Sequence, residues 1–248
     1  MDLTKEAIKY LAEQGITPAT RLIKTETGQN FVIDNNGSAQ ELKPRIYTAQ
    51  SAIELNTLTG LVEYIKANLE RQKDKLILQV INEHEVSLKG LLKIDGSRER
   101  LAVTQAIVPR FNFDHFYDTE EMNIALQSKF VINEHQALLL KVIGNIAEKN
   151  VSEASDDGVS QAVTIKQGVA SKVDVKVPNP VVLAPYRTFL EVKQPESKFI
   201  FRMQEGPRAA IFEADGGAWR NEAIRNIRDF LAKELKNELE NQRITILA

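Results

Sequence analysis

The chain carries two kinds of hydrophobic periodicity, and they occur in blocks rather than element by element. Apolar side chains recur at the two-residue spacing of half-buried strands over residues 76–80, 86–94 and 101–108, with the turn Asp95-Gly96-Ser97 before the last of these. A parallel sheet would require a crossover, usually a helix, between successive strands. The block arrangement therefore predicts an α+β fold with antiparallel sheets, beginning with a hairpin block at residues 76–108.

Helical spacing and capping residues predict where the helices begin. Thr57 and Asn133 are good N-cap residues, and Gln136 follows Asn133 at the spacing of a capping box. The expected helices begin at Thr57, Thr119, Asn133 and Asp215. Further strands are expected at residues 169–177, 186–192, 199–203, 208–212 and 244–247, the middle three as a meander. Several helices, including a long C-terminal helix, would thus pack on the antiparallel sheets.

Two changes of pattern predict how the chain divides. Residues 1–48 are interpreted as an N-terminal attachment, composed of one helix and a hairpin with strands at 22–23 and 31–33. Residues 49–248 form the expected α+β core domain. The short, polar and acidic segment 152–158 is expected to be a loop, and it is the candidate for a further boundary inside that domain.

Composition excludes several classes of protein. The 248 residues include 32 basic and 34 acidic side chains, a formal net charge of −2, which argues against a strongly basic duplex binder. There is no cysteine, so disulfides, thiolate metal sites and cysteine nucleophiles are excluded. No apolar run approaches the roughly 20 residues that cross a bilayer, and the first helix pattern is charged, unlike a signal peptide. We therefore expect no membrane partner.

Motifs for catalysis or cofactor binding are missing from the sequence. It has no phosphate-binding loop, no dinucleotide fingerprint and no nucleophile elbow. His84 and His135 end two copies of Val-Ile-Asn-Glu-His, but the flanking sequences differ, so we interpret the repeat as coincidence rather than as a metal site. Gly216-Gly217 is interpreted as a helix-entry turn. We expect no catalytic residue, no metal ligand and no cofactor, which favours a non-enzymatic protein and leaves an enzyme as the alternative.

The densest unusual feature is an aromatic segment at residues 111–117, which follows Arg110. Such a segment is typical of a plug that fills the core between a strand and a helix, and the alternative is a platform that stacks bases or grips a partner. A further alternative makes Asp114 and His115 half of an acid–base site. The candidate binding residues are Arg110, Phe111, Phe113, His115, Phe116, Tyr117, Arg187 and Arg202, the last two from the mixed-charge meander.

A set of features from residue 51 onward carries a family resemblance. They are the helix at 57–69, the hairpin at 76–108, the segment Gln127-Ser128-Lys129-Phe130, the valine strand ending in Val177-Pro178, the strand Phe199-Ile200-Phe201-Arg202 and the helix at 221–235. Their order resembles the YfdQ-like proteins of bacteriophages and prophages, a family without an established activity. The resemblance implies an accessory protein that acts in the bacterial host cytoplasm or is carried in a virion, and it implies no catalytic residues.

Three functional hypotheses remain open at this point. The first is a non-enzymatic phage or prophage accessory protein that forms a homo-oligomer and binds a host or phage macromolecule, such as a protein. The second is a single-stranded nucleic-acid binder in phage recombination or replication, which would use the aromatic segment and nearby basic side chains. The third is a small-molecule or nucleotide-binding protein that counters host defence, or an enzyme built around Asp114 and His115.

Overall fold

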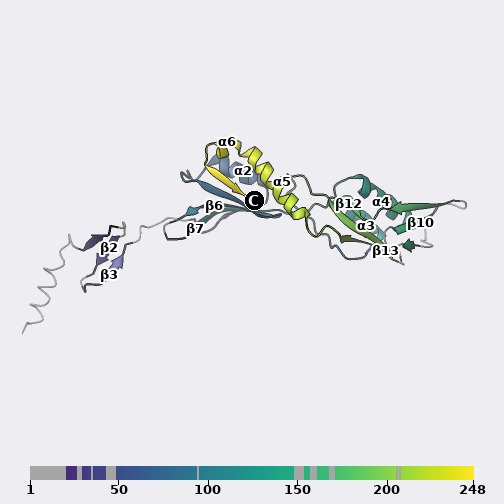
Figure 1. Ribbon diagram of the computed structural model, residues 1–248, viewed down its shortest axis with the longest axis horizontal. Coiled ribbons are helices and arrows are strands. Elements are labelled where there is room, and N and C mark those ends of the chain that lie inside the picture. The colour runs from purple at the N-terminus through teal and green to yellow at the C-terminus, as the bar shows by residue number, and fades with distance from the viewer. Residues whose placement is uncertain are drawn as a thin grey trace, which may run out of the picture. The chain divides into compact units, whose positions relative to one another are not determined.

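A computed structural model describes residues 21–26, 30–34, 36–42, 49–93, 95–147, 154–156, 161–167, 171–204, 206 and 208–248. The chain divides into two compact units, Met1–Thr48 and Ala49–Ala248. The architecture is α+β, as the sequence predicts, and the described residues form four separate sheets (Figure 1). The helix expected near the N-terminus lies outside the described residues.

The first unit contains a three-stranded antiparallel sheet. Its strands are β1 (Leu22–Lys24), β2 (Asn30–Ile33) and β3 (Ala39–Glu41), in that order across the sheet. The first two strands form the hairpin that the sequence predicts, and the third was not expected. Asp34 makes the turn into β3, because its carboxylate accepts hydrogen bonds from the backbone N–H groups of Asn36 (2.8 Å) and Ser38 (2.9 Å).

The second unit begins with a five-stranded mixed sheet. Its strands, in spatial order, are β15 (Ile244–Leu247), β5 (Leu76–Asn82), β6 (Glu85–Leu92), β7 (Arg98–Gln105) and β4 (Ile53–Leu55). The central three strands are antiparallel, as predicted, whereas β15 and β4 pair in parallel at the two edges. The helices α2 (Leu58–Ala67), α5 (Trp219–Glu234) and α6 (Lys236–Glu240) lie on one side of this sheet (Figure 1).

One hydrophobic core lies between these helices and the sheet. Leu76, Leu78 and Val80 alternate on the buried face of β5 and pack with the apolar residues of α2 and α5. The alternation predicted for residues 86–94 is wrong in its second half, since Leu92 is 65% exposed and the pairing of β6 with β7 shifts register beyond Leu88. A β-bulge of this kind turns later side chains away from their expected face.

A second core lies in a four-stranded antiparallel sheet with two helices. The strands, in spatial order, are β12 (Val181–Leu183), β13 (Ser197–Gln204), β14 (Arg208–Glu213) and β8 (Tyr117–Asp118). The helices α3 (Thr119–Lys129) and α4 (Glu134–Ala147) cover it. Phe199, Phe201 and Met203 alternate along β13 and form the buried face of this sheet with residues from both helices.

A three-stranded sheet corrects the expectation of a loop at residues 152–158. Its strands, in spatial order, are β11 (Ser171–Val177), β10 (Gln161–Gln167) and β9 (Ala154–Asp156). The valine-rich strand was predicted, whereas β10 and β9 were not. The sequence does contain a strand signal for β10, because Val163, Thr164 and Ile165 are β-branched residues, which favour strands.

The prediction of a strand at residues 186–192, the first strand of the meander, is wrong. The chain is irregular there because the buried side chain of Gln194 takes the place of a partner strand. Its Oε1 atom accepts hydrogen bonds from the N–H groups of Arg187 (3.0 Å) and Thr188 (3.3 Å). Its Nε2 atom donates to the carbonyls of Phe189 (2.9 Å) and Val192 (3.2 Å). These bonds satisfy backbone groups that a strand would otherwise have paired.

Polar side chains cap the helices close to where the sequence predicts. Thr57 accepts from the N–H of Gly60 and caps α2, and Asn133 accepts from the N–H of Gln136 (2.8 Å) at the start of α4. The long helix α5 begins at Trp219 rather than at Asp215, since the latter forms the turn that precedes it. Among the described helices, none is both long and apolar enough to cross a membrane.

Candidate functional site

The aromatic segment crosses from the end of β7 to the start of α3 and fills part of the second core. The ring of Phe111 meets that of Phe130 edge to face, with centroids 5.1 Å apart, and stacks on Tyr117 at 5.3 Å. Phe113 stacks on Phe199 of β13 at 5.3 Å. These contacts commit one ring face of Phe111 and one of Phe113 to the protein itself, which is the arrangement of a core plug.

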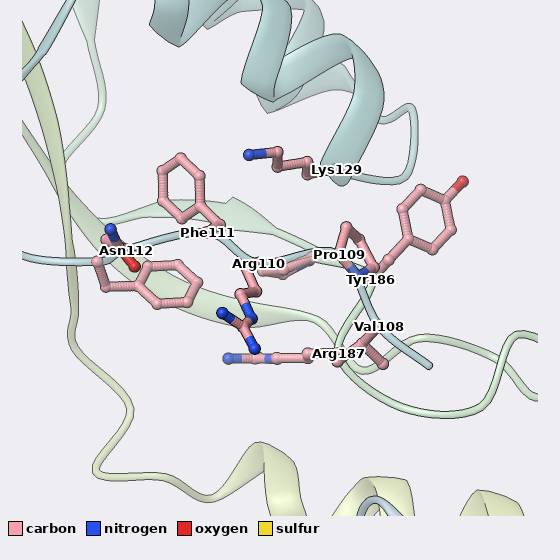
Figure 2. Close-up of a pocket in the computed structure, with 10 residues that line it drawn as sticks. Val108, Pro109, Arg110, Phe111, Asn112, Lys129, Tyr186 and Arg187 are labelled. Carbon is pink, nitrogen blue, oxygen red and sulfur yellow. The ribbon is translucent and has the colours of Figure 1, made fainter. Parts of the chain in front are cut away.

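A pocket of about 220 Å³ lies beside this segment. Its lining residues are Val108, Pro109, Arg110, Phe111, Asn112, Phe113, Lys129, Pro185, Tyr186 and Arg187 (Figure 2). Three of them are cationic and none is acidic, so we call it the basic pocket. Backbone hydrogen bonds fix its walls, because Tyr186 donates to the carbonyl of Lys129 (2.9 Å) at the end of α3 and Val131 donates to Ala184 (2.8 Å).

Arg187 is the buried cation of the basic pocket, with 7% of its surface exposed. Its Nη1 atom donates to the carboxylate of Glu213 (2.9 Å), and its Nη2 atom donates to the hydroxyl of Ser197. The guanidinium lies 3.8 Å from the centroid of the Trp219 ring, a cation–π contact. Burial lowers the pKa of Arg187 to about 10, against the opposing charge of Glu213, so the side chain stays protonated at neutral pH.

The remaining two cations of the basic pocket are more accessible. Arg110 is exposed, and Lys129 is half-buried at the last position of α3. Within the part of the chain that the structure describes, neither side chain is paired with an acidic group. The side chains of Arg110 and Arg187 extend to the same side of the pocket, and Lys129 projects from the helix above them (Figure 2). The pocket is thus a concentration of positive charge with room for a small anionic group.

Four of the eight candidate binding residues lie at the basic pocket, namely Arg110, Phe111, Phe113 and Arg187. The other four do not line it. Tyr117 packs behind Phe111 and accepts a hydrogen bond from the N–H of Asn112 (3.1 Å), and the exposed His115 meets the Tyr117 ring edge to face. Phe116 packs on Phe212 of β14, with centroids 6.0 Å apart. Arg202 lies on β13, where its Nη1 atom donates to the carbonyl of Phe201 (3.2 Å).

The proposed acid–base pair does not come together. Asp114 and His115 are both exposed, and in the described residues their side chains share no hydrogen bond. The two histidines of the repeated pentapeptide are placed differently. His84 lies in the turn between β5 and β6, while His135 lies in the first turn of α4 and accepts from the N–H of Val182 (2.7 Å). Within the described residues there is no group of three or more side chains that could hold a metal ion.

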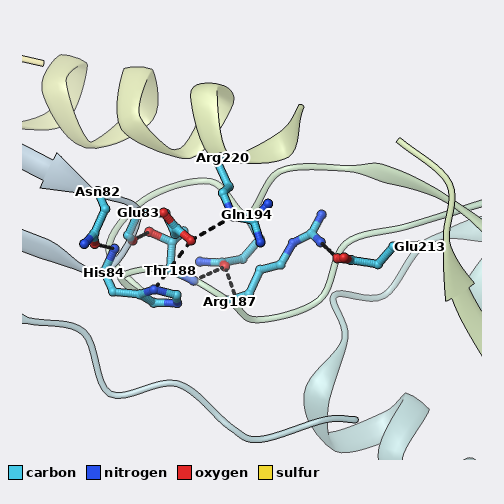
Figure 3. Close-up of polar contacts among 8 residues, drawn as sticks. All are labelled: Asn82, Glu83, His84, Arg187, Thr188, Gln194, Glu213 and Arg220. Carbon is cyan, nitrogen blue, oxygen red and sulfur yellow. Dashed lines mark hydrogen bonds and ion pairs between the residues drawn. The ribbon is translucent and has the colours of Figure 1, made fainter. Parts of the chain in front are cut away.

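A polar junction supports the segment that carries Arg187 (Figure 3). Thr188 is fully buried, and its hydroxyl donates to the carbonyl of Glu83 (2.5 Å) in the turn between β5 and β6. The Glu83 carboxylate accepts from Nε of Arg220 (3.1 Å) on α5 and lies 3.7 Å from Nδ1 of His84. The junction therefore anchors the segment of Arg187 and Thr188 to the five-stranded sheet.

Sequence reasoning missed six lining residues of the basic pocket, namely Val108, Pro109, Asn112, Lys129, Pro185 and Tyr186. The isolated bridge between Phe130 and Pro185 places Lys129 beside Tyr186, a long-range contact without a local signal. Chemically, cations that line a pocket without an acidic lining residue can bind carboxylate or phosphate oxygens. The resemblance to YfdQ-like proteins stays a prediction. Comparisons with models of protein families, with curated proteins and with solved structures find no match to this chain.

Proposed function

We propose that this chain is a non-enzymatic phage or prophage accessory protein that binds a host or phage protein through the basic pocket. The observation that carries the proposal is that Arg110, Lys129 and Arg187 all line one pocket that has no acidic lining residue. An arginine supplies a planar, permanently charged group that suits ion pairs and the recognition of carboxylate or phosphate groups. The phage setting and the place of action in the host cytoplasm rest on the family resemblance alone.

A protein partner fits the pocket better than a nucleic-acid strand does. Base stacking needs free aromatic faces, and one face of Phe111 and one face of Phe113 are already stacked on Tyr117 and Phe199. The volume of about 220 Å³ is below the roughly 300–1,000 Å³ that is usual for drug-sized ligands. The net charge of −2 gives a strand of phosphates no general attraction. These properties favour a single acidic group presented by a partner protein.

The test is binding of labelled probes to the whole chain, measured by fluorescence anisotropy at low salt. The probes are a short peptide rich in glutamate and an oligothymidylate. We expect the peptide to bind and the double variant Arg110→Gln/Lys129→Gln to lose roughly tenfold in affinity, about 1.4 kcal/mol. The matched control is Lys198→Gln/Arg225→Gln, two exposed cations outside the pocket, which should bind like the wild type. Equal binding by both double variants would contradict the proposal, and preferential binding of the oligothymidylate would favour the nucleic-acid alternative.

Self-association is the second element of the proposal. Its support is a set of exposed large apolar side chains in the second unit, among which Ile132, Leu69 and Ile107 are 82%, 76% and 71% exposed. Covering such a side chain contributes roughly 1.5–3 kcal/mol. We expect a homo-oligomer in sedimentation equilibrium. A monomer over the whole accessible concentration range would remove this element and leave the pocket proposal intact.

A further inference from the structure

The charges around the basic pocket specify the anionic group more closely. This inference rests on the proposed function and deepens it. Arg187 is already balanced by Glu213, to which its Nη1 atom donates. Arg110 and Lys129 have no acidic partner among the described residues, so two positive charges remain uncompensated at the pocket. A group that carries close to two negative charges would balance them, whereas a carboxylate would balance only one.

The hydrogen-bond donors point the same way. The donor nitrogens of Arg187 are not available to a ligand, because Nη1 donates to Glu213, Nη2 donates to Ser197 and Nε is buried. The donors left to the pocket are the fork of Arg110 and the ammonium of Lys129. Together they present more than two N–H groups, which suits a tetrahedral group with three acceptor oxygens better than a planar carboxylate with two.

We propose that the basic pocket binds a phosphate monoester carried on a segment of the partner protein, such as a phosphoserine. A phosphate monoester has a charge of about −1.5 to −2 near neutral pH and three acceptor oxygens. The pocket's 220 Å³ accepts this group and a few atoms beyond it, so the carrier segment remains outside. The apolar lining residues Val108, Pro109 and Pro185 would contact the carbon atoms next to the phosphate.

The experiment compares short alanine–glycine peptides that differ only at the central residue, which is serine, glutamate or phosphoserine. Binding to the whole chain is measured by anisotropy, with inorganic phosphate as a competitor. We expect the phosphoserine peptide to bind at least about tenfold more tightly than the glutamate peptide. Arg110→Gln and Lys129→Gln should each remove most of this preference, and the control Arg225→Gln should keep it. Binding of the phosphoserine peptide should weaken below about pH 6, where the monoester gains a proton.

The outcomes separate this inference from the proposed function. Equal binding of the glutamate and phosphoserine peptides overturns the phosphate inference and leaves the proposed function standing. Failure of both peptides to bind overturns both. Inorganic phosphate that binds as tightly as the phosphoserine peptide overturns the assignment to a protein carrier, since the carrier then adds nothing. A preference for an oligonucleotide with a 5′-phosphate over the phosphoserine peptide overturns it in favour of a nucleic-acid end. Only tighter binding of the phosphoserine peptide that depends on Arg110 and Lys129 supports the inference.

Discussion

At the scale of single residues, Arg187 combines a structural role with a place in the basic pocket. It bonds to Ser197 and Glu213 and stacks on Trp219, while its buried Nε atom has no hydrogen-bond partner among the described residues. Its importance could be anticipated only in part, because the sequence identifies an arginine among mixed charges but not its burial. Arg110, Phe111 and Phe113 were found through local density of aromatic and basic residues. Lys129 was missed because no local sequence pattern relates the last residue of α3 to the loop at residues 108–113.

Asp215 carries a pH dependence of stability that can be measured. Burial opposes its ionisation, but hydrogen bonds from the N–H of Gly217 and the hydroxyl of Ser197 outweigh this and hold its pKa below the ordinary value. A depressed pKa contributes stability that is present above the unfolded pKa of about 3.9 and is lost as the pH falls through the folded pKa. We expect the free energy of unfolding of the Asp215→Asn variant to fall less steeply than that of the wild type below about pH 4.

Urea unfolding at a series of pH values gives this comparison directly. The asparagine keeps a side-chain oxygen that can accept from Gly217, so the turn before α5 should persist. Asp229→Asn is the matched control, because that carboxylate is 64% exposed and pairs with the neighbouring Arg228 on the surface. Parallel acid profiles for wild type and Asp215→Asn would show that this carboxylate does not contribute.

At the scale of elements, the irregular segment from residue 184 to 196 differs most from expectation. Its apolar residues resemble a strand in sequence, yet Phe189 and Val192 are buried by turns that the side chain of Gln194 stabilises. Local periodicity predicts elements whose hydrogen bonds are made by backbone alone, such as β5, β13 and α5. It fails where one polar side chain supplies the bonds, because hydrophobic spacing contains no information about that side chain's orientation.

Gln194→Leu tests the role of this side chain. The substitution keeps the size roughly constant but leaves up to four buried backbone groups without partners. Each such group costs about 1–3 kcal/mol, so we expect a loss of roughly 2–4 kcal/mol in the free energy of unfolding after partial relaxation. Amide hydrogen exchange at Arg187 and Thr188 should accelerate. The exposed Gln105 at the end of β7 provides the control Gln105→Leu, and equal stability of the two variants would argue against the proposed role.

At the scale of the whole molecule, the second unit contains two hydrophobic cores that share connecting segments. Leu183 belongs to the core under the four-stranded sheet, while Phe189, six positions later, belongs to the core under the five-stranded sheet. The aromatic segment makes a similar crossing from β7 to α3. The α+β class could be predicted from block order, but the number of sheets could not, since it depends on which strands pair over long range.

The shared segments predict that the two cores of residues 49–248 unfold together. Leu78→Ala in the first core and Phe201→Ala in the second each remove a fully buried side chain, at a cost of about 2–5 kcal/mol. We expect each variant to accelerate amide exchange in both sheets, as seen by hydrogen-exchange mass spectrometry. Thr245→Ala, at an exposed position of β15, is the control. Acceleration confined to β13 and β14 in Phe201→Ala would show instead that the cores are independent.

The cation–π contact between Arg187 and Trp219 has an optical consequence. Trp219 is the chain's single tryptophan, so all indole emission comes from a ring that lies against the buried guanidinium of the basic pocket. We expect an anion bound beside Arg187 to change the electric field at that ring, and this change needs no label on protein or ligand. Trp219 emission should therefore report occupancy of the basic pocket, which would suit a screen of phosphorylated and unphosphorylated ligands in plain buffer.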